Sequence, residues 1–199
     1  GGMDTLFGTS IPIAAAEPTA TDAVLLDATG AVGQTVIDLA GSRAVLALYA
    51  KNQGGLGFTL TNGNLLIGRD GIVNGSNGTL VMHNGVSLGA PQYWDGGNGG
   101  IVLKGALDNQ GYLLEIDGSG TNFFNGGVTG AGGLAKDGAG HLVVGGTAGW
   151  QGATFVHEGT VLISNTSAAA LGSPVKLDEG AGITFGGAQL TVPWLEGSN

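Results

Sequence analysis

The first candidate for chemistry is a run of two aromatic side chains and a carboxylate, Tyr93-Trp94-Asp95. Flat aromatic rings stack on sugar rings, and polar neighbours hydrogen-bond sugar hydroxyls. The run lies in the glycine-rich segment 89–100, which predicts an excursion from the body of the protein. Tyr93, Trp94 and Asp95 are therefore the best candidate ligand-binding residues, although the favoured interpretation of Tyr93 and Trp94 is a hydrophobic lid folded onto the body.

A second candidate is a pair of carboxylates, Glu115 and Asp117, in a predicted strand. Residues two apart in a strand share a face, and two carboxylates on one face can perform acid–base glycoside chemistry. Asp108 and Lys104 lie near them in the sequence. The alternative is that Asp117-Gly118 is a simple corner.

The remaining signals for chemistry are weak. His83, His141 and His157 lie in or beside predicted strands, without the His-x-His spacing of a metal site, so we expect them to face outward. The nucleophile motif GxSxG and the calcium-binding nonapeptide do not occur. The sequence therefore predicts a protein that is not an enzyme, with no catalytic residue, no metal and no cofactor.

The composition excludes several classes of protein. Glycine supplies 42 of 199 residues, but without the three-residue period of collagen. An apolar share of 42% argues against disorder, and the absence of cysteine excludes disulfides and thiolate metal sites. The net charge is −9 and the six basic residues are scattered, so we expect neither nucleic acid nor an anionic membrane as a partner.

Short apolar runs alternate with glycine-rich corners, as at 142–144, 153–156 and 161–163. Their β-branched and aromatic residues predict strands joined by turns. Glycine, any residue and two aliphatic residues recur, beginning at Gly63, Gly78, Gly111, Gly140 and Gly159. The uneven gaps argue against an exact-period solenoid and fit a β-helix with variable corners, of about eight or nine rungs stacked about 4.8 Å apart.

The two ends are expected to differ from the middle. Pro12 and Pro18 predict an irregular lead-in or an N-terminal cap over residues 1–20. Residues 31–50 are interpreted as strands, with a helix as the alternative, and residues 167–171 as one possible helical turn.

A last strand is expected at 190–194. Its unpaired edge, protected only by Pro193 and Glu196, predicts weak self-association through this end. The sequence contains no apolar run of 18 residues and no signal peptide, so an exported protein would be represented here by a mature or excised piece.

The most regular stretch is 132–163. It follows the pattern GGL-x-K-x-G-x-G-x-L and then G-x-T-x-V-x-x-GT, with Gly132, Gly133, Leu134, Lys136, Gly138, Gly140, Leu142, Gly152, Thr154, Gly159 and Thr160 at the motif positions. On these residues it resembles the autotransporter-associated β-strand repeat of bacterial passenger regions. Val161 replaces the usual Leu, Trp150 stands where the family often has Tyr, and a looser likeness runs from about Phe58 to Leu190.

The resemblance implies an all-β protein, a right-handed parallel β-helix over residues 21–199. It also implies an extracellular or cell-surface location, reached by export through the outer membrane of a bacterium. The expected function is a non-enzymatic structural or adhesive segment of an autotransporter-like protein, with a surface glycan or protein of a host or neighbouring cell as partner. The alternatives are a carbohydrate-active β-helix enzyme and a glycan-binding module using Tyr93 and Trp94.

Overall fold

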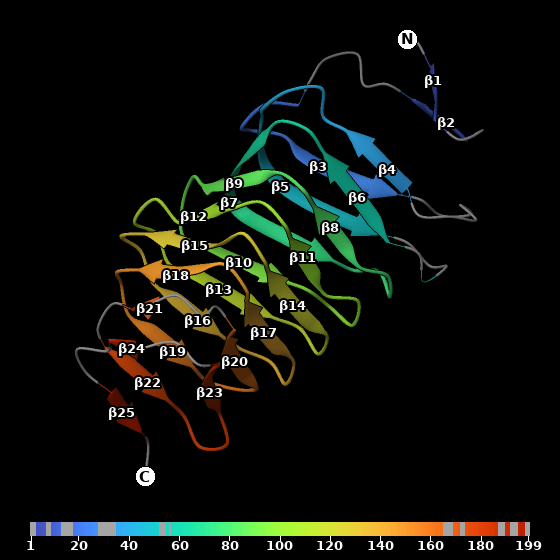
Figure 1. Cartoon of the computed structure of the whole chain (residues 1–199). Coiled ribbons are helices and arrows are strands. Elements are labelled where there is room, and N and C mark those ends of the chain that lie inside the picture. The colour runs from blue at the N-terminus through green and yellow to red at the C-terminus, as the bar shows by residue number, and fades with distance from the viewer. Residues whose placement is uncertain are drawn as a thin grey trace.

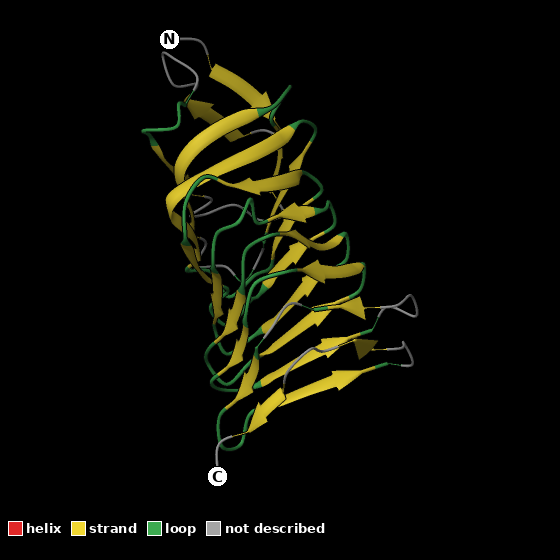
Figure 2. Ribbon diagram, turned by 90° about the vertical axis from the view of Figure 1, so that its left-hand side faces the viewer, coloured by secondary structure: helices red, strands yellow, loops and turns green. Residues whose placement is uncertain are grey.

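The structure is a computed structural model that describes residues 3–6, 9–12, 18–27, 35–51, 55, 57–164, 169–171, 174–186, 190–191 and 195–197. It is a β-solenoid in which parallel strands stack in about seven coils, and Figures 1 and 2 show the resulting elongated stack. The predicted all-β parallel β-helix is thereby confirmed. The described part contains no helix, and so no helix able to cross a membrane.

The first face of the solenoid is an eight-stranded parallel sheet. Its strands, in stacking order, are β4 (Thr35–Asp38), β6 (Phe58–Thr61), β8 (Leu80–Met82), β11 (Ile101–Leu103), β14 (Thr121–Phe124), β17 (His141–Val144), β20 (Thr160–Ile163) and β23 (Gly182–Phe185).

Two further faces complete each coil. The second face holds β9 (Gly85–Leu88), β12 (Leu107–Asp108), β15 (Gly127–Gly130) and β18 (Thr147–Trp150). The third face holds β10 (Gln92–Asp95), β13 (Leu114–Asp117), β16 (Leu134–Lys136), β19 (Thr154–Val156), β22 (Val175–Leu177) and β25 (Leu195–Gly197). In Figure 1 these two series run down the left and the middle of the stack.

The coil length is more regular than the glycine pattern indicated. Register partners on the first face, such as Thr59 and Val81 or Val143 and Leu162, lie 19 to 23 residues apart. The glycine pattern has uneven gaps because Gly63 and Gly111 precede strands of other faces, whereas Gly78, Gly140 and Gly159 precede strands of the first face. The eight stacked strands of the first face agree with the lower end of the predicted eight or nine rungs, and β1 and β2 form a separate sheet.

Strand β7 (Asn64–Asn74) joins two cross-sections. On one side it pairs along its length with β5 (Arg43–Lys51), which in turn pairs with β3 (Ala23–Asp27). On its other side the first half pairs with β9 and the second half with β10. One long strand per coil therefore becomes two short strands, and the second and third faces separate below β7.

Both ends differ in part from expectation. Residues 3–6 and 9–12, expected to be irregular, form an antiparallel hairpin of β1 (Met3–Leu6) and β2 (Thr9–Pro12). The helix alternative for 31–50 is wrong, because β4 and β5 occupy the described part of that range.

Near the C-terminus, the described part of 167–171 holds the short strand β21 (Ala169–Ala170), which pairs with β24 (Leu190–Thr191). The final described strand is β25 rather than 190–194, whose residues 192–194 lie outside the described residues.

Inward side chains stack in columns along the solenoid. One column of the first face is Leu60, Met82, Leu103, Phe124, Val144 and Ile163, all at most 1% exposed. Alternation along each strand brings the intervening side chains outward, as at Val81 in β8 and Val102 in β11, which are partly exposed between buried neighbours. Each coil therefore covers the apolar faces of its two neighbours.

The corners bring backbone directly onto backbone. Gly105, Gly126 and Gly146 occupy the corner between the first and second faces in three successive coils. A Cβ atom added to Gly126 would lie 2.2 Å from the carbonyl carbon of Gly105, and one on Gly146 would lie 2.4 Å from the amide nitrogen of Gly127. Only glycine fits such a contact, which explains the high glycine content.

We expect Gly126→Ala to destabilise the solenoid by about 1–3 kcal/mol or more, because its Cβ collides with the next coil. Gly149→Ala is the matched control, since its Cβ would lie 3.5 Å from Thr147 Cγ2, an ordinary contact, and we expect a change within about 0.5 kcal/mol. Urea unfolding and melting temperatures measure both. Equal losses in the two variants would contradict the corner assignment.

The register predicts which of two adjacent aliphatic residues tolerates a charge. Leu142 is fully buried, whereas Val143 lies on the outer side of β17. Leu142→Asp places an unpaired carboxylate in the core and is expected to cost about 3 kcal/mol or more. Val143→Asp is expected to cost much less in the same melting experiment, and a reversed order would mean that the strand is turned over.

Candidate functional site

The segment 89–100 is not an excursion from the solenoid. Gln92–Asp95 is the regular strand β10, paired in parallel with β7 and β13. Trp94 is fully buried, its ring lies edge-on to Phe124 at a centroid distance of 5.8 Å, and its Nε1 donates to Gln92 Oε1 at 2.8 Å. The predicted excursion and the predicted hydrophobic lid are therefore both wrong, because this segment is a regular strand and its indole completes the core.

Strand alternation separates the predicted aromatic pair. Tyr93 is 42% exposed on the outer side of β10, whereas Trp94 faces inward. The two rings cannot form one stacking platform. Of the three predicted ligand-binding residues, Tyr93 and Asp95 lie on the outer side and Trp94 does not.

Five titratable side chains occupy equivalent positions at the ends of successive strands of the third face. We call them the acidic column: Asp95, Asp117, Asp137, His157 and Asp178. Asp95 pairs in register with Asp117. Asp137, His157 and Asp178 each follow directly after a strand, and the backbone amide of each donates a hydrogen bond to a carbonyl of the preceding coil. Strands about 4.8 Å apart bring these charges close together, so the carboxylates repel one another.

A phenol stabilises one member of the column. The Tyr93 hydroxyl donates to Asp117 Oδ2. This bond, together with donation from the Gly118 amide, lowers the pKa of Asp117. Partial burial and the same hydrogen bond raise the pKa of Tyr93. At neutral pH the pair is therefore a neutral phenol donating to a carboxylate.

The neighbouring carboxylate is shifted in the opposite direction. Glu115 lies next to Tyr93 in register and shares the outer face of β13 with Asp117, as predicted. Partial burial, and then the negative charges of Asp137 and Asp117, raise the pKa of Glu115. The two carboxylates of β13 therefore differ in their readiness to hold a proton.

His157 interrupts the run of carboxylates. Its Nδ1 lies 2.8 Å from Asp178 Oδ2, and its ring stacks on Phe155 with centroids 5.9 Å apart. The hydrogen bond to Asp178 raises the pKa of His157, with a smaller contribution from the charge of Asp137. The predicted outward orientation of His83, His141 and His157 is confirmed, since all three are exposed.

Lys136 has an unusual place for a lysine. It is fully buried in the inward column between Ile116 and Val156, and its ammonium donates to the carbonyl oxygens of Asp137 and Gly138. Burial lowers the pKa of Lys136, and the nearby carboxylates oppose this shift. The lysine of the repeat motif therefore stabilises the corner at Asp137 and Gly138 through hydrogen bonds made from inside the solenoid.

The other motif residues are also structural. Leu134 and Leu142 are core residues, and the Thr154 hydroxyl accepts from Trp150 Nε1 at 2.7 Å. The Thr160 hydroxyl lies 2.5 Å from His141 Nδ1. A Cβ would lie closer than 3.0 Å to a neighbouring coil at each motif glycine, namely Gly132, Gly133, Gly138, Gly140, Gly152 and Gly159.

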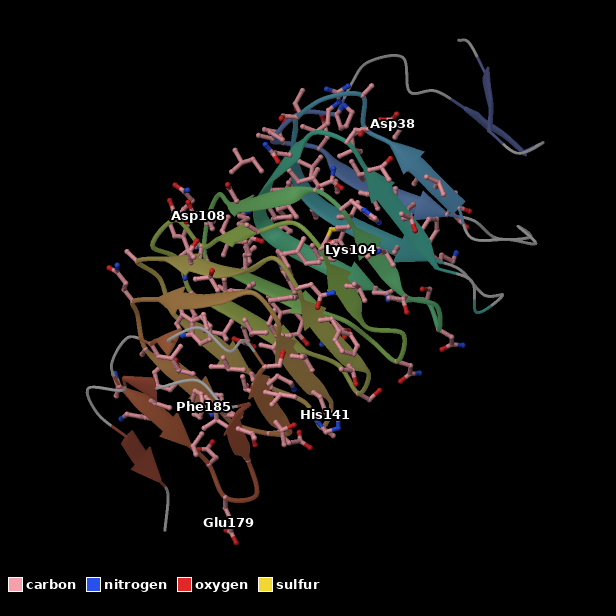
Figure 3. All side chains as sticks on the ribbon, in the orientation of Figure 1. Asp38, Lys104, Asp108, His141, Glu179 and Phe185 are labelled. Carbon is pink, nitrogen blue, oxygen red and sulfur yellow. The ribbon has the colours of Figure 1, made fainter. Side chains whose placement is uncertain are left out.

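The wider acid–base cluster considered for an enzyme does not assemble. Asp108 ends β12 on the second face, and Lys104 follows β11 at the corner beside the first face. Figure 3 shows these two residues well apart. Only Glu115 and Asp117 of the four share a face, and within the described residues no group of three or more His, Asp or Glu side chains is placed to hold a metal ion.

A pocket with a volume of about 410 Å³ lies between β5, β7, β9 and the turn after β12. Its lining includes Arg43, Asn64, Leu66, Ser87, Gln110 and Tyr112. Sequence analysis missed this site because its residues come from four separate segments of the chain. The only local signal is the turn-forming run Asn109-Gln110-Gly111.

We expect the pKa of His157, followed by NMR, to lie above 6.5, and Asp178→Asn to lower it, because the first cause of the shift is their hydrogen bond. A raised folded-state pKa stabilises the protein below the unfolded-state pKa, and this contribution is lost as the pH rises through the folded-state pKa. The loss of melting temperature in Asp178→Asn should therefore shrink from about pH 5 to about pH 8.

Asp95→Asn, at the other end of the acidic column, is the control and should leave the His157 titration unchanged. A wild-type value at or below 6.5, or equal effects of the two variants, would contradict this pairing.

No protein-family model, no curated protein and no solved structure matches this chain. The functional conclusion therefore depends on the geometry of the described residues and on the motif resemblance of 132–163.

Proposed function

We propose that this chain is a non-enzymatic structural and adhesive segment of an autotransporter-like bacterial surface protein, exported to the extracellular side. The observation that carries the proposal is the uninterrupted stack of coils, whose first face repeats every 19 to 23 residues from β4 to β23. Such a stack holds its two ends apart and presents long outer faces, which suits a segment that projects from a cell.

The energetics of a solenoid suit export as an unfolded chain. Each coil contacts chiefly its neighbours, so folding can begin at one end and continue coil by coil. The chain has no cysteine, so no disulfide can lock a compact form before passage through a pore. These two properties support an export route of the kind that the motif resemblance implies.

The net charge of the chain is compatible with the proposed extracellular location. The net charge of −9 disfavours contact with nucleic acid and with anionic membranes. The proposed partner is a surface glycan or protein of a host or neighbouring cell.

A second candidate is a carbohydrate-active β-helix enzyme. One observation favours it: Glu115 and Asp117 share the outer face of β13, and their pKa values are shifted in opposite directions. Pairs shifted in this way serve as acid and base in known glycosidases. We rank it second because Asp108 and Lys104 lie on other parts of the solenoid.

Residues 1–199, fused between a signal peptide and an outer-membrane translocator in a Gram-negative host, are expected to reach the cell surface and resist added protease as a folded core. The control fusion carries Gly126→Ala, which should be degraded faster because its coils stack poorly. Surface labelling and protease digestion of whole cells measure both.

Retention of the wild-type fusion in the periplasm would contradict export by this route. Release of reducing ends from polysaccharides by the purified protein, abolished in Glu115→Gln, would overturn the non-enzymatic assignment in favour of the second candidate.

A further inference from the structure

We propose that the pocket between β5, β7, β9 and the turn after β12 binds a carboxylated sugar, such as one uronic acid unit of an acidic polysaccharide. This inference rests on the proposed adhesive function and names the ligand class and the site. Its volume of about 410 Å³ falls within the range of small-ligand sites, roughly 300–1,000 Å³.

A single positive charge marks the pocket. Arg43 is its one charged lining residue, in a protein with net charge −9. A guanidinium carries five N–H donors in a planar fork that matches a carboxylate, and Arg43 Nη1 also donates to the Ser42 carbonyl at 3.1 Å. Elsewhere, the acidic column disfavours an anion, so a carboxylated ligand is directed toward Arg43.

The remaining polar lining matches sugar hydroxyls. Asn64 and Gln110 offer carboxamides, and Ser42 and Ser87 offer hydroxyls. These groups both donate and accept hydrogen bonds, as a hydroxyl-rich ring requires. Gln110 Nε2 donates to Asp108 Oδ2 at 2.5 Å, which holds the Gln110 side chain in place.

Apolar surface is available for the C–H face of a sugar ring. Leu66 is 42% exposed and Tyr112 is 37% exposed, and both line the pocket. Exposed aromatic and aliphatic groups beside polar groups give a surface that contacts both the ring and its hydroxyls. The pocket therefore combines the three kinds of contact that an acidic sugar offers.

The turn that carries Gln110 and Tyr112 is held rigidly. The Tyr112 amide donates to the Asn109 carbonyl at 2.8 Å, and the buried Asn109 Oδ1 accepts from the amides of Gly111 and Gly132. Gln110 has φ of 53°, a left-handed conformation that is costly for a residue other than glycine.

Backbone strain gathers around this pocket. The described part has three non-glycine residues with positive φ, namely Ala40, Asn62 and Gln110. Gln110 lines the pocket, and the other two lie two positions before the lining residues Ser42 and Asn64. Strain of this kind concentrates at binding sites, where the surrounding structure maintains it.

The test is an NMR titration of the whole ¹⁵N-labelled chain with digalacturonate and with its dimethyl ester, which lacks the charges but keeps the ring. We expect amide shifts at Arg43, Ser87 and residues 64–66 and 110–112. Arg43→Gln should weaken binding of digalacturonate by about tenfold or more, because it removes a charged donor. The dimethyl ester should bind the wild-type protein about as weakly as digalacturonate binds the Arg43→Gln variant.

Arg69→Gln is the control for charge, because Arg69 lies in β7 but not in the pocket, with a side chain that is 76% exposed. It should leave the affinity unchanged. Tyr112→Ala is the second pocket variant and should also weaken binding, while melting temperatures show that each variant is folded.

Absence of shifts at millimolar digalacturonate, shifts confined to the acidic column, or equal affinity for the ester would overturn the inference. If digalacturonate does not bind but the surface fusion is displayed, the pocket assignment fails and the proposed function stands. If digalacturonate binds but the fusion is not displayed, the pocket assignment stands and the proposed surface function fails.

Discussion

Direct stacking of each coil's backbone on the next is the constraint on which the structure depends. Parallel ladders satisfy the backbone polar groups only if successive coils stay about 4.8 Å apart, at the corners as well as in the strands. At that spacing a corner such as Gly105, Gly126 and Gly146 has no room for a Cβ atom. The constraint accounts for the glycines at these corners.

The same stacking aligns side chains of one kind into columns, inside and outside. Inside, the columns are apolar, and where Lys136 enters one of them its ammonium is satisfied by corner carbonyls. Outside, alignment places carboxylates from different coils next to each other, with a cost in repulsion. The donation from Tyr93 to Asp117 and the pairing of His157 with Asp178 offset part of that cost. The acidic column is thus a consequence of the register in which the strands stack.

The pocket arises where the solenoid changes its cross-section. Strand β7 pairs with β9 through its first half and with β10 through its second half, and the pocket lies beside the first half. A uniform stack has flat outer faces, so a departure from uniformity is where a small ligand finds a concave surface. The left-handed residue Gln110 and the single cation Arg43 both belong to this irregular region.

Local chemistry in the sequence was sufficient to predict the class of fold. Alternating apolar residues and glycine corners predict the strands and turns of a β-helix, because strand alternation and the steric freedom of glycine act over a few residues, and the resemblance of 132–163 implies that the strands are parallel. The sequence could not predict that Trp94 is buried while Tyr93 is exposed, or that Arg43 and Tyr112 line one pocket. Those facts depend on how many residues each coil leaves to its corners, because the column of Phe124, Val144 and Ile163 stays aligned although the coils differ in length. Only the tertiary structure decides that count, through the packing of each coil on its neighbours.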